Sequence, residues 1–138
     1  MNIRIIPMSI YNSEFEGKTI NQIQKEFFDD YLNCEGKGWY YYGRKGMEAN
    51  KGDLLLFQMK NSIIASAKLN DIIKFKKPTV DGNLGVYILS KNTIKSFKPI
   101  TKEELSKLII GFTTFNQTKQ KFSISDVALK VLNARMSL

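Results

Sequence analysis

A segment near the C-terminus combines three kinds of side chain that together can bind a nucleotide. Residues 112–122 hold three phenylalanines, several amides and two lysines. A ring can stack on a base, an amide can bond to a base edge, and a lysine can neutralise a phosphate. The candidate binding residues in this expected loop are Asn116, Gln117, Lys119 and Lys121. A solvated connector held in place by its phenylalanines is the alternative.

A run of four aromatic residues, Trp39 to Tyr42, is the second candidate. Aromatic residues favour strands, and a strand places alternate side chains on opposite faces. One pair of rings can therefore serve the core while the other faces a groove, and we assign Trp39 and Tyr41 to stacking on a base. The alternative is that Trp39 and Tyr41 belong to the core, while Tyr40 and Tyr42 lie at its boundary with their hydroxyls in water.

The next loop, residues 43–46, places Arg44 and Lys45 between two glycines. Backbone N–H groups and two cations can meet a phosphate in such a loop. Its spacing is not that of a P-loop or of a dinucleotide-binding motif. An ordinary surface hairpin is equally compatible with it.

Two apolar runs in the middle of the chain predict a hairpin with polar residues at its turns. Asp53 in a Gly-Asp turn starts the run 54–57, and a second run covers residues 63–69. Both runs are too short for helices and are bounded by turn residues, which favours strands. Gln58 and Ser66 are candidate base contacts, because an amide can both donate to and accept from a base edge. Simple exposure to solvent is the alternative.

The residue types that the chain lacks restrict its chemistry. It has no histidine and one cysteine, Cys34, so Ser-His pairs, thiolate zinc sites and HNH nuclease centres are excluded. The nearest approach to a metal-dependent nuclease motif is Gln58-x-Lys60 with Asp53 or Glu48 upstream. A glutamine cannot supply the second carboxylate for Mg²⁺. We expect no catalytic residues, no metal and no cofactor, with a nuclease of unusual centre as a minor hypothesis.

The charge of the chain is distributed unevenly. Residues 1–56 carry seven basic and eight acidic side chains, a balance of −1, and residues 57–138 carry fourteen and five, a balance of +9. The sum matches the net charge of +8. A lysine-rich, arginine-poor composition can arise from an AT-rich genome, but that bias would not segregate charge along the chain. The asymmetry favours a polyanionic partner over a merely solvated surface.

The order of elements predicts an α+β domain that spans residues 1–138. Strands are expected at 2–6, 39–42, 54–58, 63–69, 72–77, 85–90 and 93–98, and the alternation in 72–77 places Lys74 and Lys76 opposite Ile73 and Phe75. Capping boxes at Thr19-x-x-Gln22 and Thr101-x-x-Glu104 predict helices over about 19–33 and after 101. A last helix is expected over about 124–135, with Val127, Val131 and Leu132 buried. Five or six such strands close most naturally into a small mixed or antiparallel β-barrel with three flanking helices.

The stretch from Gly52 to Leu69, the later strands and residues 115–121 together resemble the PUA-like superfamily. Within it, the chain is most similar to the EVE, ASCH and SRA-like domains, including the reader regions found ahead of HNH nucleases in modification-dependent restriction systems. The resemblance implies a concave barrel face that holds a flipped or unpaired base between aromatic and amide side chains. Asp53 and Gln58 are the positions that match. The chain lacks the Gly-x-Lys signature of ASCH domains and any nuclease module.

We therefore expect a nucleic-acid-binding reader of a flipped or unpaired base, modified bases included, with DNA favoured over RNA. A protein-interaction or regulatory domain with an incidental basic surface is the alternative from another class, and an RNA-binding PUA-like module is a further one. A nuclease module or subunit is a candidate partner. No apolar run approaches the roughly 20 residues that cross a membrane, and the N-terminus is not that of a signal peptide, so we expect a cytoplasmic protein.

Overall fold

The computed structural model describes residues 1–9, 14–35, 37–43 and 46–138. Its strands are β1 (Asn2–Met8), β2 (Trp39–Tyr42), β3 (Leu54–Met59), β4 (Ser62–Lys74), β5 (Gly85–Leu89), β6 (Lys95–Thr101) and β7 (Gln120–Ser123). Its helices are α1 (Ile20–Ile23), which continues as the π-helix η1 (Gln24–Glu35), then α2 (Lys102–Ser106) and α3 (Asp126–Met136). No helix within these ranges is long and apolar enough to cross a membrane.

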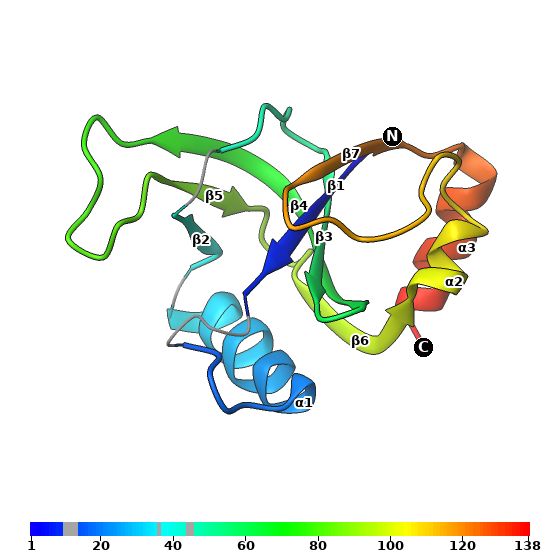
Figure 1. Cartoon of the computed structure of the whole chain (residues 1–138), viewed down its shortest axis with the longest axis horizontal. Helices are drawn as coiled ribbons and strands as arrows, with labels where there is room; N and C mark the ends of the chain where they lie inside the picture. The colour runs from blue at the N-terminus through cyan, green and yellow to red at the C-terminus, as the bar shows by residue number, and fades with distance from the viewer. Residues whose placement is uncertain (10–13, 36, 44–45) are drawn as a thin grey trace.

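The seven strands form one mixed sheet in the order β2-β5-β4-β3-β1-β7, with β6 paired to β4. Only the pair β1–β3 is parallel among the described strands. Figure 1 shows α2 and α3 together at one side of the sheet, with the α1–η1 helix away from them. The α+β class and the three flanking helical segments are confirmed. The described strand pairs do not close the expected barrel, because the sheet ends in β2 on one edge and in β7 on the other.

Strand β4 organises this open sheet. Its first half pairs with β3 and β6, and its second half pairs with β5. We expected two strands, 63–69 and 72–77, but the structure has one strand with a bulge between Leu69 and Asp71. A bulge bends a strand without ending it, so β4 passes from one part of the sheet to the other. Lys74 is the last residue of β4, and Lys76 lies beyond it.

Two strands continue beyond the ends that we expected, 6 and 98, and each passes through a proline. Pro7 lies in β1 beyond the stretch Asn2–Ile5 that pairs with β7, so β1 has a single partner strand there. Pro99 lies in β6 where the pairing with β4 is irregular. A proline is tolerated where the ladder does not require its missing N–H group.

The sheet buries a separate apolar core on each face. One core packs against η1 through Phe28 and Leu32, and it includes Phe57 and Tyr87. The other core lies under α2 and α3. Its members include Ile5, Leu56, Leu105, Ile109, Leu132 and Met136. Both faces of the central strands are therefore covered, which explains why β3 is buried along its whole length.

The orientation of α3 differs from our expectation. Leu132 is buried as expected, whereas Val127 and Val131 are 76% and 51% exposed. The buried stripe of this helix follows Ala128, Leu132 and Met136, at the i, i+4 spacing of one helix face. Val127 and Val131 share that spacing on a neighbouring face, so the periodicity alone did not distinguish the two stripes.

The two predicted capping boxes are both confirmed. At the first helix, the backbone N–H of Gln22 donates to Thr19 Oγ1 at 3.2 Å, and that of Thr19 donates to Gln22 Oε1 at 2.8 Å. The next residue but one, Gln24, is buried, and its Nε2 donates to the carbonyls of Ile64 and Phe97 at 2.9 and 2.7 Å. These bonds attach the start of η1 to β4 and to β6.

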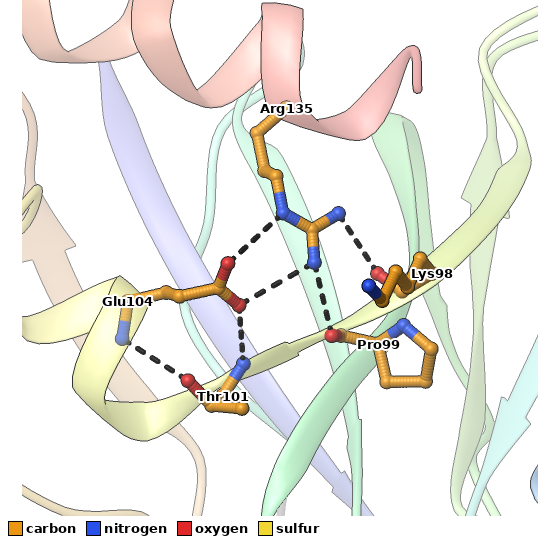
Figure 2. Close-up of polar contacts among 5 residues, drawn as sticks. All are labelled: Lys98, Pro99, Thr101, Glu104 and Arg135. Carbon is orange, nitrogen blue, oxygen red and sulfur yellow. Dashed lines mark hydrogen bonds and ion pairs between the residues drawn. The ribbon is translucent and has the colours of Figure 1, made fainter.

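A second polar cluster attaches α3 to β6 and α2 (Figure 2). The Arg135 guanidinium donates to the Glu104 carboxylate and to the backbone carbonyls of Lys98 and Pro99, and the Thr101 N–H donates to the same carboxylate. The hydrogen bond from Arg135 is the main cause that holds the pKa of Glu104 below its usual range, and the bond from Thr101 adds to it. Glu104 therefore stabilises the fold mainly as a carboxylate.

We expect the Glu104→Gln variant to lose about 1 kcal/mol of unfolding free energy at pH 7, because the carboxylate is partly exposed and its ion pair is screened. The folded-state pKa of Glu104 is lowered, so its contribution is present above the unfolded-state pKa and is lost as the pH falls through the folded-state pKa. Urea denaturation at pH 7 and at about pH 3 should therefore show a difference between the variant and the parent that shrinks in acid. Glu103→Gln, in the same helical turn, is the matched control, and a difference that is constant with pH would contradict the assignment.

Candidate nucleic-acid interface

A cleft of about 690 Å³ opens between β1, the second half of β4 and the segment that precedes β3. It is lined by Arg4, Met47, Glu48, Ala49, Asn50, Lys51, Leu69, Asn70, Asp71, Ile72, Lys74 and Lys121. Four of these side chains are cationic and two are carboxylates. Lys121 of β7 lies directly opposite Arg4 of β1 in the antiparallel register, which places both side chains on the cleft face of the sheet.

A buried ion pair forms the base of this cleft. Arg4 Nε lies 3.4 Å from Asp53 Oδ2, and the two side chains are 5% and 8% exposed. The same Oδ2 accepts the N–H of Asn50 at 2.9 Å, and the Asp53 carbonyl accepts the N–H of Leu69 at 2.9 Å. Asp53 thus connects β1, β4 and the lining segment 47–51. Asp53 lies at the predicted turn. It does not line the cleft itself, but it holds Arg4 and Asn50, which do.

Two stacked tyrosines lie beside the cleft. The rings of Tyr42 and Tyr87 are 4.4 Å apart at 17°, and Lys119 Nζ lies 5.8 and 6.0 Å from their centroids. The Tyr87 hydroxyl accepts the N–H of Met47, a lining residue, at 3.4 Å. Burial raises the pKa of Tyr87 and of Tyr42, so both phenols stay neutral at physiological pH. The neutral rings present their negative faces to the Lys119 ammonium.

A glycine makes room for this stack. Gly85 pairs with Tyr42 across β2 and β5, and a Cβ atom at position 85 would overlap the Tyr42 hydroxyl and the Ile73 carbonyl. A contact between the segment 112–122 and the aromatic strand is made by Lys119 and Tyr42. It does not involve the two rings that we selected.

Those two rings, Trp39 and Tyr41, lie on the opposite face of β2. Trp39 is 39% exposed and Tyr41 is 44% exposed, whereas Tyr40 and Tyr42 are buried. The alternative that placed Trp39 and Tyr41 in the core is wrong. The register with β5 turns both rings away from the cleft, so a base stacked on them would lie outside it.

The other sequence-based candidates are dispersed. Lys74 and Lys121 line the cleft. Gln58 and Ser66 are buried in the sheet, where Gln58 Nε2 donates to the Lys60 carbonyl and Ser66 lies opposite Leu56. Their expected exposure, to solvent or to a base, is therefore wrong. Lys76, Asn116 and Gln117 are exposed and do not line the cleft. Arg44 and Lys45 are outside the described residues.

Several lining residues were missed by sequence reasoning. Arg4 is an isolated cation in an apolar strand, Ile3-Arg4-Ile5, which is the kind of interruption that indicates a charged group facing a cavity. The segment 47–51 and Asn70 carry no comparable signal. Asn50 bonds to Asp53 only three residues away, but Asp53 is itself placed by Arg4 of β1 and Leu69 of β4. Asn70 reaches the cleft through the β4 bulge, which forms against β5. These contacts join residues distant in sequence.

The fold agrees with that of two kinds of solved domain. The structure of ASCH from Zymomonas mobilis superimposes with a TM-score of 0.55 at 11% identity, covering 96% of this chain and 94% of that one. The YTH domain of the Zygosaccharomyces rouxii MRB1 protein, in complex with N6-methyladenosine RNA, superimposes with a TM-score of 0.52 at 10% identity, covering 96% and 84%. The chain thus shares the fold of ASCH and YTH domains, which are members of the PUA-like superfamily. No protein-family model and no curated protein sequence matches it.

The PUA-like fold confirms the resemblance inferred from the hairpin and the later strands. It agrees with the element order over nearly the whole chain. At 10–11% identity the likeness concerns the backbone arrangement, so the site must be argued from this chain's own residues. A mutant form of the Zymomonas ASCH protein superimposes equally well, with a TM-score of 0.55 at 11% identity over 96% of each chain.

Proposed function

We propose that this chain is a nucleic-acid-binding module that holds one flipped or unpaired nucleotide in the cleft. The observation that carries the proposal is the set of four cations, Arg4, Lys51, Lys74 and Lys121, around a cleft of about 690 Å³ on a PUA-like fold. Cavities of about 300–1,000 Å³ are typical of small-molecule sites, so a nucleotide has room here. The strongly basic second half of the chain supports a polyanionic ligand.

The lining offers separate contacts for phosphate and base. Lys51, Lys74 and Lys121 are exposed and can pair with phosphate oxygens. The apolar side chains of Leu69 and Ile72 can contact the flat face of a base. The amides of Asn50 and Asn70 can donate to and accept from its edge. We had expected a base held between aromatic and amide side chains. In the cleft, apolar side chains take the place of the aromatic ones.

Binding assays on matched oligonucleotides test the proposal. We expect fluorescence anisotropy to show tighter binding to a single strand, or to a duplex with a central mismatch, than to a perfect duplex, because extruding a paired base costs a few kcal/mol. Affinity should fall steeply between about 50 and 200 mM salt through counterion release. If no DNA or RNA binds at about 50 mM salt, the protein-interaction alternative takes the place of this proposal.

The same assay decides between DNA and RNA. DNA with an extruded base, modified bases included, is the ligand that we expect from the sequence. RNA is the second candidate because the YTH domain of similar fold was crystallised with N6-methyladenosine RNA. Matched DNA and RNA strands with and without methylated cytosine or adenine should therefore be compared. If the protein recognises a modified base, its affinity should differ between two strands that differ only in the methylation of one base.

We further propose that the module binds without cleaving. The chain contains no histidine, and the cleft carboxylates Glu48 and Asp71 belong to no recognised nuclease motif. Incubation of bound oligonucleotides with Mg²⁺ or Mn²⁺ should leave them intact on a denaturing gel. Cleavage that disappears in Asp71→Asn or Glu48→Gln, but not in the control Asp81→Asn, would overturn this proposal.

A further inference from the structure

The face of the sheet opposite the cleft carries an exposed aromatic surface. The ring centroids of Trp39 and Tyr41 are 6.4 Å apart, and that of Phe75 is 6.3 Å from Tyr41. Ile73, at 37% exposure, continues this surface, which we call the outer aromatic face (Trp39, Tyr41, Ile73 and Phe75). Large apolar side chains gathered at one place on a surface indicate a binding site more often than isolated ones do.

The strand register shows that this surface is separate from the cleft. Tyr41 and Ile73 both lie opposite Val86 of β5, so their side chains share one face of the sheet. Ile72 and Lys74 alternate with Ile73 along β4 and line the cleft on the other face. Figure 1 shows β2 and β5 at the end of the sheet far from α2 and α3. The η1 helix packs on the other face of these strands, against Tyr40 and Tyr87. The described helices therefore leave the outer aromatic face uncovered.

Lysines flank this aromatic surface at both ends. Lys76 and Lys77 are exposed and directly follow Phe75. At the other end, exposed Lys37 precedes Gly38, whose carbonyl accepts the N–H of Leu89 at 2.8 Å. That bond also brings the exposed Lys91, two residues after Leu89, towards the same end. Asp71, opposite Ile88, is an acidic residue at the margin of this face.

The combination of rings and cations determines the kind of occupant. Rings at separate positions can each stack on one base, while flanking lysines neutralise the phosphates of the same strand. A second copy of this chain would bring lysines against lysines at both ends, which is unfavourable. We propose that the outer aromatic face binds single-stranded nucleic acid by stacking bases on Trp39 and Tyr41. The proposal rests on the proposed function only in taking nucleic acid as the ligand, since it uses a different surface.

The single tryptophan of the chain makes the proposal directly measurable. Trp39 fluorescence should be quenched by single-stranded oligo(dT) or oligo(U), because a stacked base quenches the indole, and much less by a perfect duplex whose bases are already stacked. Tyr41→Ala should weaken single-strand binding about tenfold by anisotropy. Val131→Ala, a change at an exposed residue of α3, should leave binding unchanged. Trp39→Phe keeps a ring for stacking and should bind nearly as well as the parent.

The possible results distinguish binding at the outer aromatic face from nucleotide binding in the cleft. Quenching that persists in the cleft variant Lys74→Ala/Lys121→Ala supports a second surface, whether or not the cleft holds a nucleotide. Oligonucleotide binding without Trp39 quenching, and with no effect of Tyr41→Ala, would overturn the outer-face proposal while leaving the cleft intact. Absence of any oligonucleotide binding at low salt would overturn both. A Trp39 emission that changes with protein concentration alone would assign the face to self-association and overturn the proposal too.

Discussion

Replacing Asp53 with alanine should lower the free energy of unfolding by about 3 kcal/mol, because it leaves the buried Arg4 guanidinium without its counter-charge. Both side chains are almost fully buried, and their nitrogen and oxygen atoms lie 3.4 Å apart. The alanine also removes the acceptor for the Asn50 N–H, which frees the lining segment 47–51. Urea denaturation of the two proteins should show the loss as a lower midpoint with a similar slope.

A set of variants isolates the charge from the hydrogen bond. Asp53→Asn keeps an acceptor for Asn50 but removes the charge, and Arg4→Met removes the opposite charge. The double variant Arg4→Met/Asp53→Asn should be less destabilised than the sum of the two single variants, since neither charge remains unpaired. Asp71→Ala, an exposed cleft carboxylate, is the control and should change stability by less than about 0.5 kcal/mol. Additive effects at Arg4 and Asp53 would refute the coupling.

Removing the two cleft lysines should weaken nucleic-acid binding about 100-fold at low salt. Lys74 and Lys121 come from β4 and β7 and line the same cleft. A hydrogen bond to a charged group contributes about 1.5–3 kcal/mol, so the loss of two phosphate contacts reaches about 3 kcal/mol. Lys74→Ala/Lys121→Ala should also reduce the slope of log affinity against log salt by about 2, one for each contact.

The matched control has the same net charge but a different location. Lys107 directly follows α2 and Lys130 lies in α3, and both are exposed. Figure 1 shows these two helices at the side of the sheet away from β2 and β5. Lys107→Ala/Lys130→Ala should therefore bind nearly as tightly as the parent, with an unchanged salt slope. Equal losses in the two double variants would mean that only the total charge matters, and the cleft would have no special role.

The parts of the fold that follow local rules could be predicted from the sequence. The capping boxes at Thr19 and Thr101 formed with both of their hydrogen bonds, because each depends on residues within one turn. The β3–β4 hairpin followed from two apolar runs around a polar turn. The PUA-like fold followed from this hairpin and the strands after it, since the order of elements restricts the topology.

The parts that depend on register could not be predicted. A slip of one residue exchanges the faces of a strand, and the sequence of four aromatic residues in β2 does not say which pair is buried. Pairing with β5 decided it in favour of Tyr40 and Tyr42. Gln58 and Ser66 were misplaced for a similar reason, because covering helices on both faces bury polar positions that an open sheet would expose. Strand β7 was missed because its pairing with β1 joins residues more than a hundred positions apart.

The cleft is tested most directly by mapping amide chemical shifts of the labelled protein while a single-stranded oligonucleotide is added. We predict that the largest changes fall on residues 47–51, on Leu69 to Ile72 and on Lys121, which line the cleft. Additional changes at Trp39 and Tyr41 would report the outer aromatic face. Changes confined to α2, α3 and their neighbours, with the cleft residues unaffected by saturating oligonucleotide, would contradict the proposal that the cleft holds a nucleotide.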